Sequence, residues 1–156
     1  MSELTFRWPE ASDTERGGAA LGACLRGGDA VLVSGDLGAG KTVFVRGAGG
    51  ALGVTAPITS PTFTLIEEYA ARGRARLVHM DLYRLERAEE AEVIGVFDFF
   101  RPDAIVFVEW PELIEAAMPP EALRVEIKGS GATERRARFI FAEEFWGERL
   151  LPLTVQ

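Results

Sequence analysis

Residues 35–42 read Gly-Asp-Leu-Gly-Ala-Gly-Lys-Thr and match the phosphate-loop pattern G-x-x-x-x-G-K-[ST]. In such a loop, backbone N–H groups converge on phosphate oxygens at the start of a helix, and glycines permit the close approach. The Lys41 ammonium would reach the β- and γ-phosphates of a nucleotide, and the Thr42 hydroxyl would bind Mg²⁺. We therefore predict a nucleotide site that uses the whole loop: Gly35, Asp36, Leu37, Gly38, Ala39, Gly40, Lys41 and Thr42.

The segments on either side of the loop support this prediction. An apolar, β-branched run at residues 29–34 predicts a buried strand, and residues 42–46 can open a helix. Strand, glycine loop and helix is the context that phosphate binding needs. An ordinary glycine-rich turn is the alternative, but it leaves Lys41 without a role in a chain whose only other lysine is Lys128.

Two carboxylates are candidates for the acidic partner that a phosphate loop needs for Mg²⁺. Glu109 follows the apolar run at 104–108, and Asp81 ends the run at 77–80. The usual residue at the metal-holding place is Asp, so Glu109 is a departure, although its longer side chain could reach the metal directly or through water. Each acid could instead be solvated at a strand end or cap a turn.

Three other features lie near these acids. Residues 59–64, which include Ser60, Pro61 and Thr62, form a hydroxyl-rich stretch that could order around a γ-phosphate, or could simply lead into a strand. His79, the only histidine, is predicted to share a strand face with Asp81, and a structural role is favoured over proton transfer. Trp110 beside Glu109 could be a core aromatic, a mobile lid or a partner contact.

Length and composition predict one globular domain over residues 1–156, with 47% hydrophobic and 26% charged residues. No apolar run approaches a membrane span and the first residues lack signal-peptide features, so we expect a cytoplasmic protein without membrane contact. The single cysteine, Cys24, excludes an intrachain disulfide. A formal net charge of −7 argues against non-specific nucleic-acid binding, so any role on RNA is expected to run through a partner.

Apolar patterning predicts strands that alternate with helices. Strands are expected at residues 4–8, 29–34, 63–69, 75–81, 104–108, 123–128 and 136–141, and helices from 12, from 42, at 85–94 and at 143–151. The short connection at 70–74 contains Gly73 and suits a β-hairpin. With the phosphate loop, this pattern predicts an α/β, three-layer P-loop NTPase-like fold whose mixed central sheet includes a hairpin.

Five segments together resemble the bacterial TsaE family, the small ATPase of the pathway that forms threonylcarbamoyladenosine in tRNA. They are GDLGAGKT at 35–42, the following Arg46-Gly47 pair, SPTFTL at 60–65, HMDLYRL at 79–85 and VEWPE at 108–112. The match spans most of residues 29–112 in family order and fades beyond Glu112. It is far more specific than a phosphate loop alone.

The resemblance implies an ATP- and Mg²⁺-dependent hydrolase that works with TsaD and TsaB and meets tRNA only through their complex. It implies that residues 35–42 hold phosphates, that Thr42 and Glu109 bind Mg²⁺, and that Asp81 and Trp110 are functional. It also matches residues 60–64 to a switch-like loop. Contacts to adenine come from the chain ends in the family, and Glu10 and Arg138 are the candidates here.

The expected reaction is hydrolysis of the β–γ phosphoanhydride by water in line, with Lys41 and loop amides stabilising charge. Asp81 or a group near Thr62 could orient that water, and no built-in arginine finger can be named, so the isolated chain should be slow. A GTPase is a rival, but its N-K-x-D motif needs asparagine, of which this chain has none. A small-molecule kinase and a nucleotide-dependent adaptor with little hydrolysis remain open alternatives.

Overall fold

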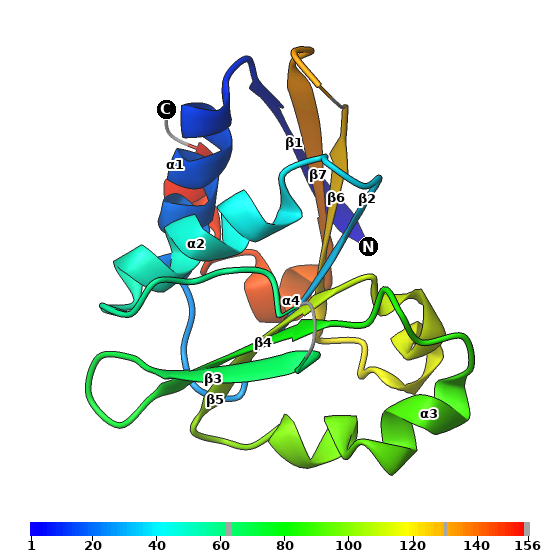
Figure 1. Cartoon of the computed structure of the whole chain (residues 1–156). Coiled ribbons are helices and arrows are strands. Elements are labelled where there is room, and N and C mark those ends of the chain that lie inside the picture. The colour runs from blue at the N-terminus through cyan, green and yellow to red at the C-terminus, as the bar shows by residue number, and fades with distance from the viewer. Residues whose placement is uncertain (62–63, 130, 155–156) are drawn as a thin grey trace.

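The computed structural model describes residues 1–61, 64–129 and 131–154. Within these residues, seven strands form one mixed sheet in the order β1-β7-β6-β2-β5-β4-β3 (Figure 1). Their bounds are β1 Ser2–Trp8, β2 Ala30–Gly35, β3 Ile66–Ala70, β4 Arg76–Asp81, β5 Ala104–Glu109, β6 Leu123–Lys128 and β7 Arg135–Phe141. β6, β2, β5 and β4 are parallel neighbours, while β1, β7 and β3 pair antiparallel. The predicted mixed sheet and its β3–β4 hairpin are confirmed.

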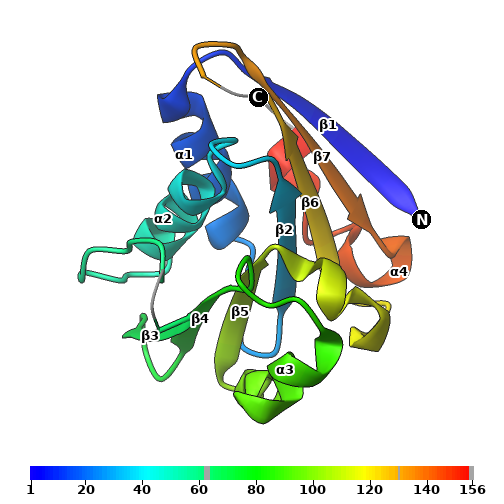
Figure 2. The ribbon, with the colours of Figure 1, turned by 45° about the vertical axis from the view of Figure 1, so that its right-hand side comes forward.

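Helices lie on both faces of the sheet, which gives the predicted three layers. α1 (Ala11–Gly22) and α2 (Lys41–Ala51) pack side by side on one face, and α3 (Ala88–Val93) lies on the other (Figures 1 and 2). Three short 3₁₀ helices come later in the chain. One follows α3, at Val96–Phe99, and two follow β5, at Pro111–Leu113 and Glu115–Ala117. The described part ends with α4 (Glu143–Trp146) and a 3₁₀ helix, Leu151–Thr154.

Strand β5 shows why the middle of the sheet carries an unbroken apolar run, from Ala104 to Val108. All six of its residues are buried. Ile105 and Phe107 belong to the core under α1 and α2, whereas Val106 and Val108 belong to the core under α3. A parallel strand covered on both faces needs apolar side chains at consecutive positions, and this explains the unbroken run in the sequence.

Two glycines allow α1 and α2 to cross at close range. A Cβ atom on Gly18 would lie 2.0 Å from the Phe44 carbonyl oxygen, and one on Gly47 would lie 2.0 Å from the Glu15 carbonyl oxygen. Any side chain at either position would force the helices apart. This crossing fixes α2, whose first residue is Lys41, against the rest of the molecule.

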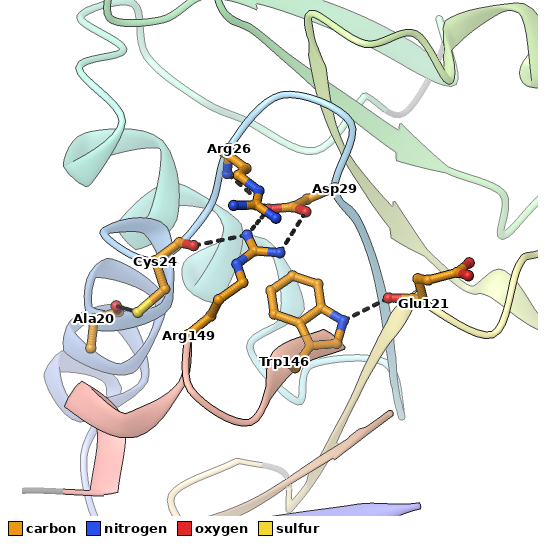
Figure 3. A network of polar contacts seen from close by, with 7 residues as sticks. All are labelled: Ala20, Cys24, Arg26, Asp29, Glu121, Trp146 and Arg149. Carbon is orange, nitrogen blue, oxygen red and sulfur yellow. Dashed lines mark hydrogen bonds and ion pairs between the residues drawn. The ribbon is translucent and has the colours of Figure 1, made fainter. Parts of the chain in front are cut away.

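An ionic cluster ties the C-terminal segment to the start of β2 (Figure 3). The Arg149 guanidinium donates to both carboxylate oxygens of Asp29, at 3.1 Å for Nη1 to Oδ1, and to the Cys24 carbonyl at 3.0 Å. It also lies 4.2 Å from the ring centre of Trp146, whose Nε1 donates to the Glu121 carbonyl at 2.6 Å. We call the Asp29–Arg149 pair the latch.

Some element boundaries differ from those that the sequence predicts. β3 begins at Ile66 because Leu65 has a left-handed φ of 64°, which breaks the extended run. The predicted strand start at Phe63 lies outside the described residues. α3 covers only part of the predicted helix at 85–94, and the segment at 143–151 is helical only to Trp146 before the later 3₁₀ turn.

Candidate functional site

The loop at residues 35–40 joins β2 to α2 and has the backbone shape that its glycines permit. Gly35, Gly38 and Gly40 have φ values of 156°, 82° and 100°. A Cβ atom on Gly35 would lie 2.5 Å from the carbonyl oxygen of Ile127 on β6. Gly40 is the N-cap of α2, so the loop ends where the helix presents its unpaired N–H groups. The loop therefore has the backbone geometry of an anion site.

Lys41 is the buried cation of this region, with 5% of its surface exposed. Its Nζ donates to the carbonyl oxygens of Gly35 at 2.6 Å and Asp36 at 2.9 Å, and lies 4.3 Å from the ring centre of Trp110. Burial lowers the pKa of Lys41, while the nearby carboxylates, first Glu109 and then Asp81, oppose this shift. Among the described residues, the ammonium has carbonyl and aromatic partners but no direct ion pair, and it is placed beside the loop amides.

Glu109 and Thr42 meet as the sequence predicts. The Thr42 Oγ1 donates to Glu109 Oε2 at 2.8 Å, and the same oxygen lies 2.5 Å from His79 Nε2. Glu109 is 3% exposed and ends β5, directly opposite Asp81 at the end of β4. Parallel strands bring their carboxyl ends to one edge of a sheet, and the two acids meet there for that reason.

Asp81 lies at the more open side of this edge. Its Oδ2 accepts from the Ser60 hydroxyl at 3.1 Å, and its Oδ1 accepts from the backbone N–H of Tyr83 at 3.1 Å. With Pro61 and Trp110, these residues line a cavity of about 250 Å³. Thr62, the third predicted residue of this stretch, lies outside the described residues.

Trp110 has a strained backbone next to Glu109. Its φ is 56°, in the left-handed region that a bulky side chain seldom adopts. The indole ring packs on the Tyr83 ring with centroids 4.9 Å apart, and its face lies toward the Lys41 ammonium. A strained residue held between the candidate cation and an exposed tyrosine is a feature of functional sites rather than of plain packing.

A second cavity of about 360 Å³ opens on the other side of the loop. Glu10 and Thr14 line it from the start of α1, and Arg135 lines it from β7. Arg135 donates from Nε to the Ala39 carbonyl at 2.9 Å. The structure therefore places Glu10, one of the two candidates for an adenine contact, beside the loop.

Arg138, the other predicted adenine-side residue, lies elsewhere. It is on the outer face of β7, where its guanidinium pairs with Glu126 at 3.3 Å and Glu3 at 3.7 Å. Side chains alternate along a strand, and the buried Ala137 and Phe139 show which face points inward. Arg135 has the same parity as these two residues, so its side chain is on the inward face of β7 and not on the face of Arg138.

The residues present fit a nucleotide with Mg²⁺. In the described part of the chain, no cluster of three or more His, Cys, Asp or Glu side chains could hold a metal by itself. Mg²⁺ in nucleotide enzymes is typically bound by one or two protein oxygens together with phosphates, so Thr42 and Glu109 suffice as the protein's share. The Thr42 proton is directed to Glu109, which leaves the oxygen lone pairs of the hydroxyl available to a cation.

The fold and the loop define the class, an α/β protein with a phosphate-loop NTPase-like fold. The sequence profile described as "Threonylcarbamoyl adenosine biosynthesis protein TsaE" matches residues 8–137. The chain belongs to the TsaE family, and the resemblance noted from its motifs is confirmed.

Relatives and a solved structure agree with this assignment. The chain is 40% identical over 139 residues to "tRNA threonylcarbamoyladenosine biosynthesis protein TsaE" of Bacillus subtilis (strain 168), covering 89% of this chain and 86% of the relative. It is 37% identical over 139 residues to the protein of the same name from Mycobacterium tuberculosis (strain CDC 1551 / Oshkosh), covering 85% and 83%. The crystal structure of B. subtilis YdiB aligns with a TM-score of 0.79 and 32% identity, covering 98% of this chain and 95% of that one. No helix within the described residues is long and apolar enough to cross a membrane.

Proposed function

We propose that this chain binds and hydrolyses ATP with Mg²⁺ in support of the complex that forms N6-threonylcarbamoyladenosine in tRNA. One observation carries the proposal: Lys41, Thr42, Glu109 and Asp81 converge where β2, β5 and β4 end beside the phosphate loop. The names of the TsaE relatives supply the tRNA modification. Residues 1–156 would act as one P-loop domain in the cytoplasm.

Each residue of the loop edge has a role in this proposal. The amides of residues 35–42 and the Lys41 ammonium would bind phosphates, with Lys41 leaving the carbonyls of Gly35 and Asp36 to do so. Thr42 and Glu109 would bind Mg²⁺. The metal, when bound, neutralises charge that develops on the phosphate oxygens.

Asp81 is the group we assign to the attacking water. Ser60 and the Tyr83 N–H hold its carboxylate from one side, so its orientation is set before a ligand enters. A carboxylate at the mouth of the site can accept a hydrogen bond from water and align it in line with the scissile bond. A group near Thr62 remains the alternative for this role.

The adenine ring would enter the cavity on the far side of the loop, between Glu10 and Arg135. A cavity of about 360 Å³ lies within the range of ligand pockets. The sequence contains no asparagine, so it cannot form the N-K-x-D motif that guanine recognition uses. Adenine is the base that these observations favour.

TsaD and TsaB are the proposed partners, with tRNA contacted through them. The mouth of the cavity beside Asp81 exposes two large apolar side chains: Leu37 is 71% exposed and Tyr83 is 56% exposed. Ser60, Pro61 and Trp110 lie around the same mouth and are the candidate contact or switch residues. A partner that covers this mouth would exclude bulk water while retaining the attacking water beside Asp81. This would strengthen the electrostatic interactions with the phosphates and raise a slow basal rate.

Phosphate release tests the proposal. Without an added acceptor, the chain should release phosphate slowly from ATP, and adding TsaD and TsaB should increase the rate. GTP in excess should compete poorly. ADP formation that requires a hydroxyl-bearing acceptor, with the phosphoryl group ending on that acceptor and no free phosphate released, would instead show a kinase. ATP binding with no stimulated release would show an adaptor.

A further inference from the structure

His79 is fully buried, yet it is not simply packed among apolar groups. It lies on β4, two residues before Asp81, and its Nε2 is 2.5 Å from Glu109 Oε2. Its other ring nitrogen, Nδ1, is buried and has no hydrogen-bond partner among the described residues. If this position were needed only for packing, an apolar ring would be more stable there, because burying a nitrogen without a hydrogen-bond partner costs free energy.

The register of the sheet explains why the two side chains meet. His79 is opposite Phe107, and Asp81 is opposite Glu109, in the parallel β4–β5 pair. His79 and Glu109 are therefore diagonal neighbours with the same parity, and diagonal neighbours lie within reach of long side chains. Val78 and Met80 point into the opposite core, so the His79 ring is on the face that carries the phosphate-loop helix.

Two side-chain groups converge on one oxygen of Glu109. Thr42 Oγ1 and His79 Nε2 both contact Oε2, at 2.8 and 2.5 Å. An ionised carboxylate only accepts hydrogen bonds, so the contact is satisfied when Nε2 carries the ring proton. In that tautomer Nδ1 is a bare acceptor, and its burial leaves no N–H unpaired.

Glutamate needs such a support more than aspartate would. It has one more rotatable bond, and the acid at the end of β5 must keep its oxygen beside the Thr42 hydroxyl. Histidine on one side and threonine on the other leave the carboxylate little freedom to turn. The departure from the usual aspartate at this place is thus accompanied by a buried group that restrains the longer side chain.

We propose that His79 is a positioning residue that holds the Glu109 carboxylate beside Thr42 and so prepares the protein's share of the Mg²⁺ site. This inference rests on the proposed function. His79 does not touch the metal or the nucleotide in this account. It acts through the orientation of Glu109, as groups behind metal ligands commonly do.

Two matched substitutions separate positioning from packing. In His79→Gln, the side-chain amide nitrogen can take the place of Nε2 and donate to Glu109, whereas in His79→Asn the shorter amide can take only the place of Nδ1. The probe is Mn²⁺ titrated into ADP-loaded protein and followed by the electron paramagnetic resonance of free Mn²⁺, with Mg²⁺ as competitor. We expect His79→Asn to weaken metal binding by about 10- to 100-fold and His79→Gln by no more than about 3-fold.

Affinity for ADP without metal serves as the control. It should stay within about 2-fold of the wild-type value in both variants, since neither touches the phosphate loop amides. Equal metal affinity in folded wild-type and His79→Asn protein would overturn the inference. If wild-type protein bound no nucleotide at all, the proposed function would fail instead, so the two failures are distinguishable.

A second measurement needs no substitution. His79 is the only histidine, so the ¹⁵N signals of its ring need no assignment by mutation. We expect the Nε2–H tautomer in the wild-type protein and a change in the Nε2 signal when Mg²⁺ is added to the ADP complex. An Nδ1–H tautomer would overturn the inference, because Nε2 could not then donate to Glu109.

Discussion

Strand β2 begins beside one buried ionic group and ends beside another, and the two differ in how their charges are satisfied. At its start, Asp29 accepts from both terminal nitrogens of the Arg149 guanidinium and from the backbone N–H of Arg26. At its end, Lys41 donates to the neutral carbonyls of Gly35 and Asp36, and among the described residues no carboxylate, Glu109 and Asp81 included, forms a direct ion pair with it. The first group is complete within the protein, whereas the second can still accept a ligand.

This difference follows from what each end must do. Arg149 and Asp29 form a bidentate ion pair (Figure 3). Bidentate pairs of arginine and carboxylate are among the strongest polar contacts in proteins, so a ligand could not bind either group more favourably. The charge of a buried ammonium is less well compensated by neutral carbonyl oxygens. A phosphate group can therefore replace those contacts with a net gain in binding free energy. We infer that the latch end serves the fold and the loop end serves binding.

The largest expected effect comes from removing the charge at the loop end. Lys41→Met should weaken ATP affinity by about 1,000-fold, since a buried charge contact to phosphate is worth several kcal/mol when truncated. The free energy of unfolding should not fall, because the variant no longer buries an ammonium. Calorimetric titration and urea unfolding measure the two effects.

Lys128→Met, at the only other lysine, is the control and should change neither ATP affinity nor the free energy of unfolding. Full ATP affinity in Lys41→Met would contradict the proposed site.

Removing the charge at the latch end should do the reverse. Arg149→Met leaves Asp29 buried and uncompensated, and should lower the free energy of unfolding by about 3 kcal/mol. ATP affinity of the folded variant should stay within about 2-fold, because the latch lies at the far end of β2. The double variant Asp29→Asn with Arg149→Met should recover part of the loss, since no buried charge then remains. If Arg149→Met left the free energy of unfolding unchanged, the latch would not stabilise the fold, and the difference inferred between the two ends of β2 would be wrong.

The sequence predicts the loop end much better than the latch end. The glycine pattern is local, and parallel strands meet at one edge, so Thr42, Asp81 and Glu109 could be brought together without coordinates. The latch joins residues 120 positions apart, and no periodicity marks such a pair. It depends on where the C-terminal segment docks, which is decided by packing that no short stretch of sequence encodes.

Within the site, the same distinction separates what was predicted from what was missed. Strand parity places Arg135 on the same face as the buried Ala137, and Arg138 on the opposite face, but which of the β7 residues borders the cavity beside the loop depends on the fold. The contact of His79 with Glu109 required the β4–β5 register, which alternation along a single strand does not supply. The left-handed φ of Trp110 is one that tryptophan rarely adopts, so the sequence does not indicate it.

A glycine pair in α2, the helix that follows the loop, tests how closely α1 and α2 are packed where they cross. Gly47→Ala should lower the free energy of unfolding by about 2 kcal/mol, because its Cβ would overlap the Glu15 carbonyl oxygen. In Gly50→Ala the new Cβ meets nothing within 4 Å, so stability should rise by about 0.5–1 kcal/mol. Urea unfolding of both variants makes the comparison. Equal effects would mean that the crossing is looser than its geometry indicates.

The smallest expected effect is a pH dependence at the loop end. Burial lowers the pKa of Lys41 below the ordinary lysine value of 10.5, with Glu109 and Asp81 partly offsetting the shift. Between the lowered pKa and the ordinary one, the unfolded chain binds more protons at Lys41 than the folded chain does. The free energy of unfolding of the wild type, relative to Lys41→Met, should therefore rise as pH increases through that window and stay level below it.

Urea unfolding of the two proteins from about pH 8 upward measures this difference, and subtracting Lys41→Met removes the titration of all other groups. A difference that fell with rising pH would mean that the neighbouring carboxylates outweigh burial. Lys41 would then be held by charge pairing, as Arg149 is at the latch, and the two ends of β2 would be alike. A difference in the free energy of unfolding that rises with pH would show that burying the charged Lys41 ammonium destabilises the folded protein. Bound phosphate is expected to offset that destabilisation.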